Sequence, residues 1–197
     1  MEKVKKIIII YFMSVYFGFG QDTQIEKLLS TISSNGEIVG FVENCYEPKI
    51  FNNIPIIPPI LSNSKLNTSS KFGYRLHPIY HKIKFHSGID ITATETDTLI
   101  ATADGLVYQI GYQSELGNFI VIQHHYGFMT LYGHLSEIFV KPKQQVNVGQ
   151  TIALIGRSGM VTGKHLHYCI IKNGFYLNPF LMIYLFLKVP NQKISSK

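Results

Sequence analysis

The chain carries the stretch His86-Ser87-Gly88-Ile89-Asp90, in which a histidine and a carboxylate stand four positions apart. The central glycine favours a strand or a loop, because glycine destabilises the interior of a helix. A chain that bends there brings the imidazole and the carboxylate to one point, and both groups are acceptable zinc ligands. Taken alone, the pair is better explained as a surface histidine and a turn-capping aspartate.

A second histidine pair follows in the motif His165-Leu166-His167. On a strand, residues two apart point to the same face, about 6–7 Å from each other along the chain. One imidazole can then bind a metal while the other faces a metal-bound water. His134, just after the apolar run that ends at Tyr132, adds a further imidazole, although a core histidine is its simplest explanation. Three protein ligands leave the fourth position of tetrahedral zinc to water, which marks a catalytic site.

The remaining four histidines are weaker candidates. His124 and His125 lie at an expected turn, and we interpret His124 as structural. His77 precedes Pro78 and is therefore biased towards an extended backbone, from which it can line a groove. His81 has the surroundings of a solvated loop.

Short apolar runs separated by glycine turns dominate residues 69–179 and predict an all-β domain. Asp104-Gly105 predicts a hairpin between the runs 99–103 and 106–110. The other expected strands are 119–123, 129–132, 145–148, 151–155 and 166–171. The apolar run 179–187 is a last strand or a short helix, because it is too short to span a membrane.

The segment 21–66 differs from the rest of the chain. Residues 24–32 carry a short helical pattern, which the turn-forming residues 33–36 end. Residues 47–64 contain four prolines that forbid a regular helix, namely Pro48, Pro55, Pro58 and Pro59. We expect this part to lie as an extended strap over a globular body.

The first residues resemble a secretory signal in composition. Lys3, Lys5 and Lys6 precede an apolar run over residues 7–19, which fits a signal peptide and is shorter than the roughly 20 residues that span a bilayer. We expect cleavage after residue 20 and export to the periplasm or the cell exterior. The alternative is an uncleaved membrane anchor.

The net charge of +6 favours attraction to an anionic surface such as a cell wall. The lysines are scattered, so no nucleic-acid-binding patch is expected. Two cysteines are no disulfide framework. Cys45 and Cys169 could pair in an oxidising compartment, but two small buried residues explain them better.

A series of short motifs follows one another in the second half of the chain. They are 72–78 (FGYRLHP), 86–91 (HSGIDI), 104–107 (DGLV), 117–118 (GN), 122–124 (IQH), 130–136 (TLYGHLS), 148–152 (VGQTI), 156–159 (GRSG), 162–168 (TGKHLHY) and 178–179 (NP). Together they resemble the lysostaphin-type (LytM-like) zinc metallopeptidases. The resemblance covers residues 69–180 and implies an antiparallel, two-sheet β fold with a groove, of the duplicated hybrid motif type.

The resemblance also implies a ligand set and a reaction. His86, Asp90 and His167 would bind one zinc ion per chain, with His134 and His165 unligated beside it. His165 would act as general base, and His134 would stabilise the oxyanion or protonate the leaving amine. This would make the chain a zinc metalloendopeptidase.

The substrate that the resemblance implies is the peptide part of bacterial peptidoglycan, with Arg75, His77 and Tyr132 on the groove wall. We expect no nucleic acid and no small-molecule cofactor as partners, a monomer, and at most a transient membrane contact. The expected organisation is a signal peptide (1–20), a helix and strap (21–66), the peptidase domain (67–187) and a polar tail (188–197).

Other hypotheses stay open at this point. A protein of the same fold could bind the wall or activate an amidase without cutting, or could cut ordinary proteins. A biotinyl or lipoyl carrier domain would need a lysine at a hairpin tip, and no lysine lies in such a motif. The strap could also lie in the groove and make the enzyme latent, with Asn44, Cys45, Asn52 or Asn53 reaching the zinc.

Overall fold

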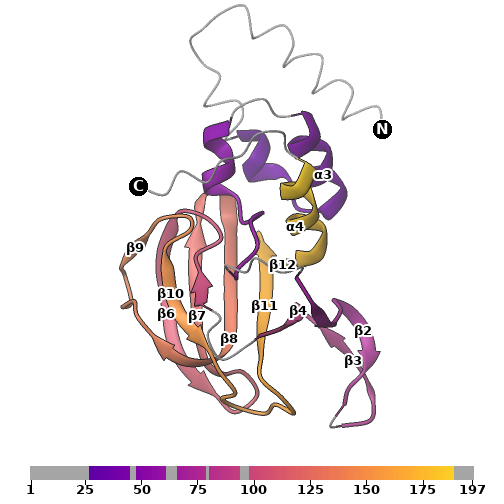
Figure 1. The fold of residues 1–197 in the computed structure, drawn as a ribbon. Coiled ribbons are helices and arrows are strands. Elements are labelled where there is room, and N and C mark those ends of the chain that lie inside the picture. Colours follow the sequence, from indigo (N-terminus) through magenta and orange to yellow (C-terminus); the bar gives the residue numbers. More distant parts are fainter. Residues whose placement is uncertain (1–26, 45–47, 61–65, 79, 94–97, 189–197) are drawn as a thin grey trace, which may run out of the picture.

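The computed structural model describes residues 27–44, 48–60, 66–78, 80–93 and 98–188. A curved β-sheet forms the body, helices gather at one end of it, and a separate hairpin projects from its side (Figure 1). All strand pairs of the described residues are antiparallel. The predicted all-β class is therefore confirmed.

The strands follow one another along the chain with few interruptions. They are β1 (Thr68–Ser70), β2 (Gly73–Leu76), β3 (Ile83–His86), β4 (Ile89–Thr92), β5 (Thr98–Ile100), β6 (Gly105–Gln113), β7 (Gly117–His124), β8 (Phe128–Ile138), β9 (Gln145–Val146), β10 (Thr151–Ile155), β11 (His165–Lys172) and β12 (Phe175–Leu177). The main sheet has the order β1-β4-β11-β8-β7-β6-β9, β10 joins β5 to β8, β12 pairs with β11, and β2–β3 form a two-stranded sheet.

The central strands are buried on both faces. In β7 the consecutive residues Phe119, Ile120, Val121 and Ile122 are all buried, as expected for β-branched and aromatic residues in the middle of a sheet. The neighbouring strand β8 is the longest of the sheet at 11 residues. Because β11 lies between β4 and β8, its first residues stand in the middle of the sheet.

The hairpin expected at Asp104-Gly105 is wrong. Strand β5 pairs with β10, while β6 pairs with β7 and β9. The Asp104 carboxylate accepts the backbone N–H of Val148 at 2.6 Å, and the Asp104 N–H donates to the carbonyl of Asn52 at 2.7 Å. These two bonds hold the turn as a crossover between neighbouring parts of the sheet.

The N-terminal region contains one helix more than expected. Residues 27–31 are helical, and the turn chemistry at 33–36 then starts α3 (Asn35–Asn44). Ser34 Oγ accepts the N–H of Glu37 at 3.3 Å, and the Glu37 carboxylate accepts the N–H of Ser34 at 3.2 Å. This reciprocal capping box fixes the beginning of the helix.

The apolar run near the C-terminus forms a short helix, α4 (Pro179–Lys188). Pro179 occupies the first turn, where a missing N–H costs nothing, and Asn178 Oδ1 caps the N–H of Phe180 at 3.1 Å. Helix α4 packs on α3 and on β11. No helix of the described residues is both long and apolar enough to cross a membrane.

The strap begins with the short 3₁₀ helix η1 (Pro48–Asn53) and continues over the body. Ile54, Ile56 and Ile57 are buried, and the carbonyl of Pro59 accepts the N–H of Ile100 at 2.9 Å. The carbonyl of Asn52 in the strap accepts the N–H of Asp104, in the turn before β6. The first residue of β6, Gly105, pairs with His124 at the end of β7. This end of the sheet lies away from His86, Asp90 and His167.

Candidate metal centre

Three strands bring His86, Asp90 and His167 together. Asp90 on β4 stands directly opposite His167 on β11, and His86 is the last residue of β3. The bend between β3 and β4 lies tightly on β11, because a Cβ atom on Gly88 would approach the carbonyl oxygen of Tyr168 to 2.2 Å. Any side chain at this position would push the bend, and His86 with it, away from β11.

The three potential ligand atoms form a nearly equilateral triangle. Asp90 Oδ1 lies 2.9 Å from His167 Nδ1 and 3.2 Å from His86 Nε2, and the two nitrogens are 3.1 Å apart. A tetrahedral zinc ion with ligands at about 2.0–2.1 Å has ligand atoms about 3.3 Å from each other. The donor set and its spacing therefore fit zinc, and these three residues also form a potential metal-ion group within the described part of the chain.

The outer nitrogens of both histidine ligands are engaged. His86 Nδ1 lies 2.8 Å from the Lys71 carbonyl, which only accepts, so the proton sits on Nδ1 and Nε2 is left for the metal. His167 Nε2 lies 3.1 Å from Cys169 Sγ. Such outer contacts fix the tautomer and the orientation of metal-binding imidazoles.

Two further imidazoles stand beside the triangle and present the same atom to it. His134 Nδ1 donates to the Ser158 carbonyl and His165 Nδ1 to the Gly163 carbonyl, each at 2.9 Å. Both Nε2 atoms are therefore bare in the neutral ring. The two rings are 4.6 Å apart, and His165 Nε2 is 3.8 Å from Asp90 Oδ1. His134 has a left-handed backbone with a φ of 63°, a strained conformation that is common at functional sites.

The electrostatics of the centre favour a cation between the ligands. Burial raises the pKa of Asp90, but hydrogen bonds from His167 and His86 outweigh it and hold this pKa well below its usual range. Burial lowers the pKa of His167, but Cys169 and Asp90 raise it to about 10.

His134 behaves in the opposite way. Burial lowers its pKa to about 4. The hydrogen bond to the Ser158 carbonyl raises this pKa by less than burial lowers it, and the rings of His165 and His167 lower it a little further. At neutral pH His134 is therefore an uncharged imidazole that can accept a proton through Nε2.

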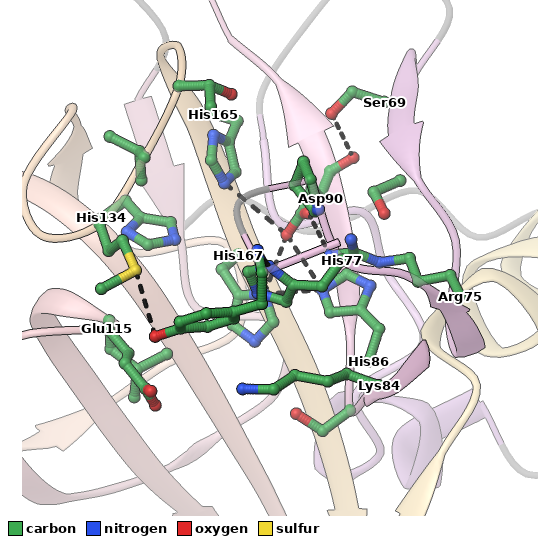
Figure 2. Close-up of a pocket in the computed structure, with 18 of the residues that line it drawn as sticks. Ser69, Arg75, His77, Lys84, His86, Asp90, Glu115, His134, His165 and His167 are labelled. Carbon is green, nitrogen blue, oxygen red and sulfur yellow. Dashed lines mark hydrogen bonds and ion pairs between the residues drawn. The ribbon is translucent and has the colours of Figure 1, made fainter. Parts of the chain in front are cut away.

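The centre lies at the floor of a pocket of about 620 Å³. Figure 2 shows Arg75 and Lys84 on one side of it, and Glu115 and His134 on the other. Tyr80 reaches over the pocket, and its hydroxyl lies 3.5 Å from the sulfur of Met160. Arg75 and His77 both line the pocket, at the wall where we expected them.

Tyr132 does not line the pocket, and its expected place on the groove wall is wrong. The side chain is fully buried, and its hydroxyl is hydrogen-bonded to Thr102 Oγ1 at 2.9 Å and Thr130 Oγ1 at 3.0 Å. Asn52 and Asn53 also lie at the end of the sheet away from the pocket, so the described strap does not fill the groove. Cys45 lies outside the described residues, and its pairing with Cys169 stays untested.

Sequence reasoning missed the partners that orient the imidazoles. The carbonyls of Lys71, Ser158 and Gly163 belong to the backbone and leave no trace in residue type. Cys169 carried a signal that was not used, because it stands two residues after His167 on the same strand face.

The chain is similar to known peptidases. The profile of peptidase family M23 matches residues 84–179. A Neisseria meningitidis protein named DD-carboxypeptidase/endopeptidase Mpg is 42% identical over 111 residues, which are 56% of this chain and 26% of that protein. The chain thus spans about a quarter of the length of this curated relative.

Two solved structures are also similar. A zinc containing peptidase from Vibrio cholerae has a TM-score of 0.56 and 32% identity, with 66% of this chain and 39% of that chain covered. A mutant of the catalytic domain of the prophage-encoded M23 protein EnpA from Enterococcus faecalis has a TM-score of 0.53 and 32% identity, with 64% and 95% covered.

Proposed function

The chain belongs to peptidase family M23, and from this premise we propose that it is a zinc-dependent endopeptidase that hydrolyses peptide bonds of bacterial peptidoglycan. The observation that carries the proposal is the triangle of His86, Asp90 and His167, with ligand atoms 2.9–3.2 Å apart. The imidazoles of His134 and His165 beside it, each with its Nδ1 bound to a backbone carbonyl, supply the acid–base groups that hydrolysis needs.

The substrate class rests on the relatives. Two Vibrio cholerae proteins that are 41% identical to this chain over 105 and 117 residues are named peptidoglycan DD-endopeptidases, and this chain corresponds to 24% and 27% of them. The Neisseria protein is named a DD-carboxypeptidase/endopeptidase. Stem peptides or their cross-links are therefore the proposed substrates.

His86, Asp90 and His167 would hold one zinc ion, which polarises the scissile carbonyl and lowers the pKa of a bound water towards about 7. His165 is proposed to take the proton from the attacking water, because its bare Nε2 lies 3.8 Å from the ligand atom Asp90 Oδ1. The Gly163 carbonyl holds the His165 ring in the tautomer that can accept this proton.

His134 is proposed to pass on to the leaving amine the proton that His165 takes from the water, since the two rings are neighbours, 4.6 Å apart. Its Nδ1–H is fixed by the Ser158 carbonyl, so Nε2 can donate only after it has gained a proton. The low pKa of His134 suits this role, because a weakly basic imidazole releases its proton readily once charged. A purely neutral His134 would not donate to an oxyanion.

Export and wall association are proposed from the same substrate. The predicted signal peptide, residues 1–20, lies outside the described residues. Expression of the full chain with a C-terminal tag, followed by fractionation and sequencing of the mature N-terminus, would show whether it is exported and where it is cut.

The enzyme is tested by digestion of purified peptidoglycan sacculi, with fragments identified by mass spectrometry. The zinc-loaded chain from residue 21 is expected to release cleaved peptides, and a chelator is expected to stop the release. His165→Ala should keep zinc and lose most of the rate. His125→Ala is the matched control, because His125 is exposed in the 3₁₀ turn η2 (His125–Gly127), outside the pocket.

A folded, zinc-loaded chain that releases nothing from sacculi would contradict the proposal and support the non-cleaving, wall-binding alternative. Cleavage that a chelator does not affect would contradict the role of zinc.

A further inference from the structure

The hairpin β2–β3 separates its side chains into two faces. Its register places Tyr74 opposite Phe85 and Arg75 opposite Lys84. Because directly opposed residues of an antiparallel pair point to the same side, both cations stand on one face and both aromatic residues on the other. The face with Arg75 and Lys84 is the one turned to the ligand triangle (Figure 2).

The two cations of this face have little negative charge to balance them. Arg75 Nη2 lies 3.5 Å from Asp90 Oδ2, and Arg75 Nε is buried without a hydrogen-bond partner among the described residues. The ammonium of Lys84 lies 3.8 Å above the ring of Tyr80, and no described carboxylate forms an ion pair with it. Like charges placed directly opposite each other on a hairpin destabilise it, so an anion between them would be favoured.

The positive potential of this wall reaches the neighbouring residue. The pKa of His77 is lowered, first by its partial burial and then by the charges of Lys84 and Arg75. The opposite wall contributes a single acidic residue to the pocket lining, Glu115, besides the ligand Asp90. The pocket is therefore polarised, with its cationic side formed by the hairpin.

We infer that Arg75 and Lys84 form a subsite for a free carboxylate on the substrate residue whose amine leaves in the reaction. This inference rests on the proposed function and narrows its substrate class. Arg75 contacts Asp90, so the subsite begins directly beside the metal ligands. Only two atoms separate the scissile carbonyl carbon from this carboxylate, namely the leaving nitrogen and the carbon next to it. A substrate bound for cleavage therefore places its carboxylate close to the metal ligands.

The subsite has a consequence for bond choice. A cross-link or chain end in which D-alanine is joined to a D-amino-acid centre bearing a free carboxylate presents the required group. A glycyl-glycine bond inside a peptide bridge has no free carboxylate on the leaving residue. The chain should therefore cut the first type of bond and discriminate against the second.

The test uses two stem peptides that end in D-alanyl-D-alanine, one with a free terminal carboxylate and one with a terminal carboxamide. The zinc-loaded chain is expected to cleave the acid with a kcat/KM about 10- to 100-fold above that of the amide, as charge-assisted hydrogen bonds in a partly buried site allow. Lys84→Gln should lower this ratio by a factor of about 10 relative to the wild type, with most of the change in the acid peptide.

Lys82→Gln is the matched control, because Lys82 lies on the same hairpin, is exposed and does not line the pocket. It should keep the wild-type ratio. Arg75→Gln should also reduce the ratio, and Arg75→Lys should restore part of it. Equal rates for acid and amide, or a ratio that Lys84→Gln leaves unchanged, would overturn the inference while leaving the endopeptidase in place.

A second measurement separates the inference from the proposed function. Calorimetric binding of both peptides to the chelator-treated chain removes direct coordination of the carboxylate by zinc. If the wild-type chain binds the acid peptide more tightly than the amide, and Lys84→Gln loses this preference, the subsite is supported even when neither peptide is cut. Equal binding of acid and amide by the wild-type chain would overturn it.

Discussion

His124, the last residue of β7, and His134, within the neighbouring strand β8, have nearly the same local chemistry. Each is buried, each donates Nδ1–H to a backbone carbonyl at 2.9 Å, and burial lowers the pKa of each to about 4. The difference lies at the second nitrogen. His124 Nε2 meets the Thr130 hydroxyl at 2.7 Å, whereas His134 Nε2 faces the pocket.

A perturbed pKa by itself therefore does not mark a functional histidine. His124 belongs to a sealed hydrogen-bond chain that continues through Thr130 to Tyr132 and Thr102. His134 stands among metal-ligand candidates with one nitrogen left over for chemistry.

Loss of a ligand should have the largest effect. His167→Ala removes one corner of the ligand triangle, and we expect activity on sacculi to fall by a factor of about 10³ or more together with the bound zinc. Elemental analysis and fragment release measure the two effects. Full zinc content with retained activity would remove His167 from the ligand set.

Removal of the open imidazole should affect the rate but not the metal. His134→Ala is expected to lower kcat by about 10²–10⁴, the usual contribution of an acid–base group. Zinc content should stay at the wild-type level, since His134 lies outside the triangle. A parallel loss of zinc would show instead that His134 binds the metal.

Removal of the buried His124 imidazole should lower stability and leave the rate unchanged. His124→Ala leaves the Asp104 carbonyl and the Thr130 hydroxyl without their partner and opens a cavity, so we expect a loss of about 2–4 kcal/mol in the free energy of unfolding. Zinc content and kcat should be unchanged in the folded fraction. Urea denaturation gives the first quantity, and a midpoint equal to that of the wild type would contradict the prediction.

The stability of the fold should depend on pH through His124. Its pKa is about 4 in the folded chain and 6.5 in the ordinary case, so the unfolded chain takes up the proton first as the pH falls. The contribution of His124 to the free energy of unfolding is fully present above about pH 6.5 and declines as the pH falls to about 4. Below that pH the loss is complete, at roughly 3 kcal/mol. Urea denaturation of the chelator-treated chain between pH 7.5 and 4 measures it. The free energy of unfolding should change less steeply with pH in His124→Asn than in the wild type. Equal slopes in both proteins would show that His124 does not cause the pH dependence.

The smallest effect should come from replacing Cys169, whose sulfur lies 3.1 Å from His167 Nε2. Cys169→Ala removes the group that holds this ring, and we expect the Kd for zinc to rise about 10-fold, the lower end of the range for such partners. Competition with a chromophoric chelator measures the Kd. Cys169→Ser keeps an acceptor at this place and should lie closer to the wild type than Cys169→Ala does.

Short-range patterns predicted most of the strands, whereas the residues that meet at the centre were predicted only through the family resemblance. The pairing of His167 with Asp90 is a matter of register between β4 and β11, which no single segment specifies. Tyr132 was misplaced for a related reason. A regular strand would put residues 132 and 134 on one face, but the positive φ of His134 interrupts the alternation.

Other errors came from side chains that act on distant backbone. The Asp104 carboxylate serves the N–H of Val148, and this long-range bond turns a typical hairpin pair into a crossover. By contrast, α3 could have been predicted, because Ser34 and Glu37 have the spacing of a capping box. That signal was overlooked because the neighbouring residues Ser33 to Gly36 also favour a turn.

The left-handed backbone at His134 has an evolutionary consequence. Glycine and asparagine adopt this conformation more easily than histidine does, so selection for hydrolysis keeps a residue there that the backbone disfavours. In a lineage released from that selection, replacement by either residue would raise stability and abolish proton transfer in one step. Descent from enzyme to inactive binding protein is thus easier at this position than the return.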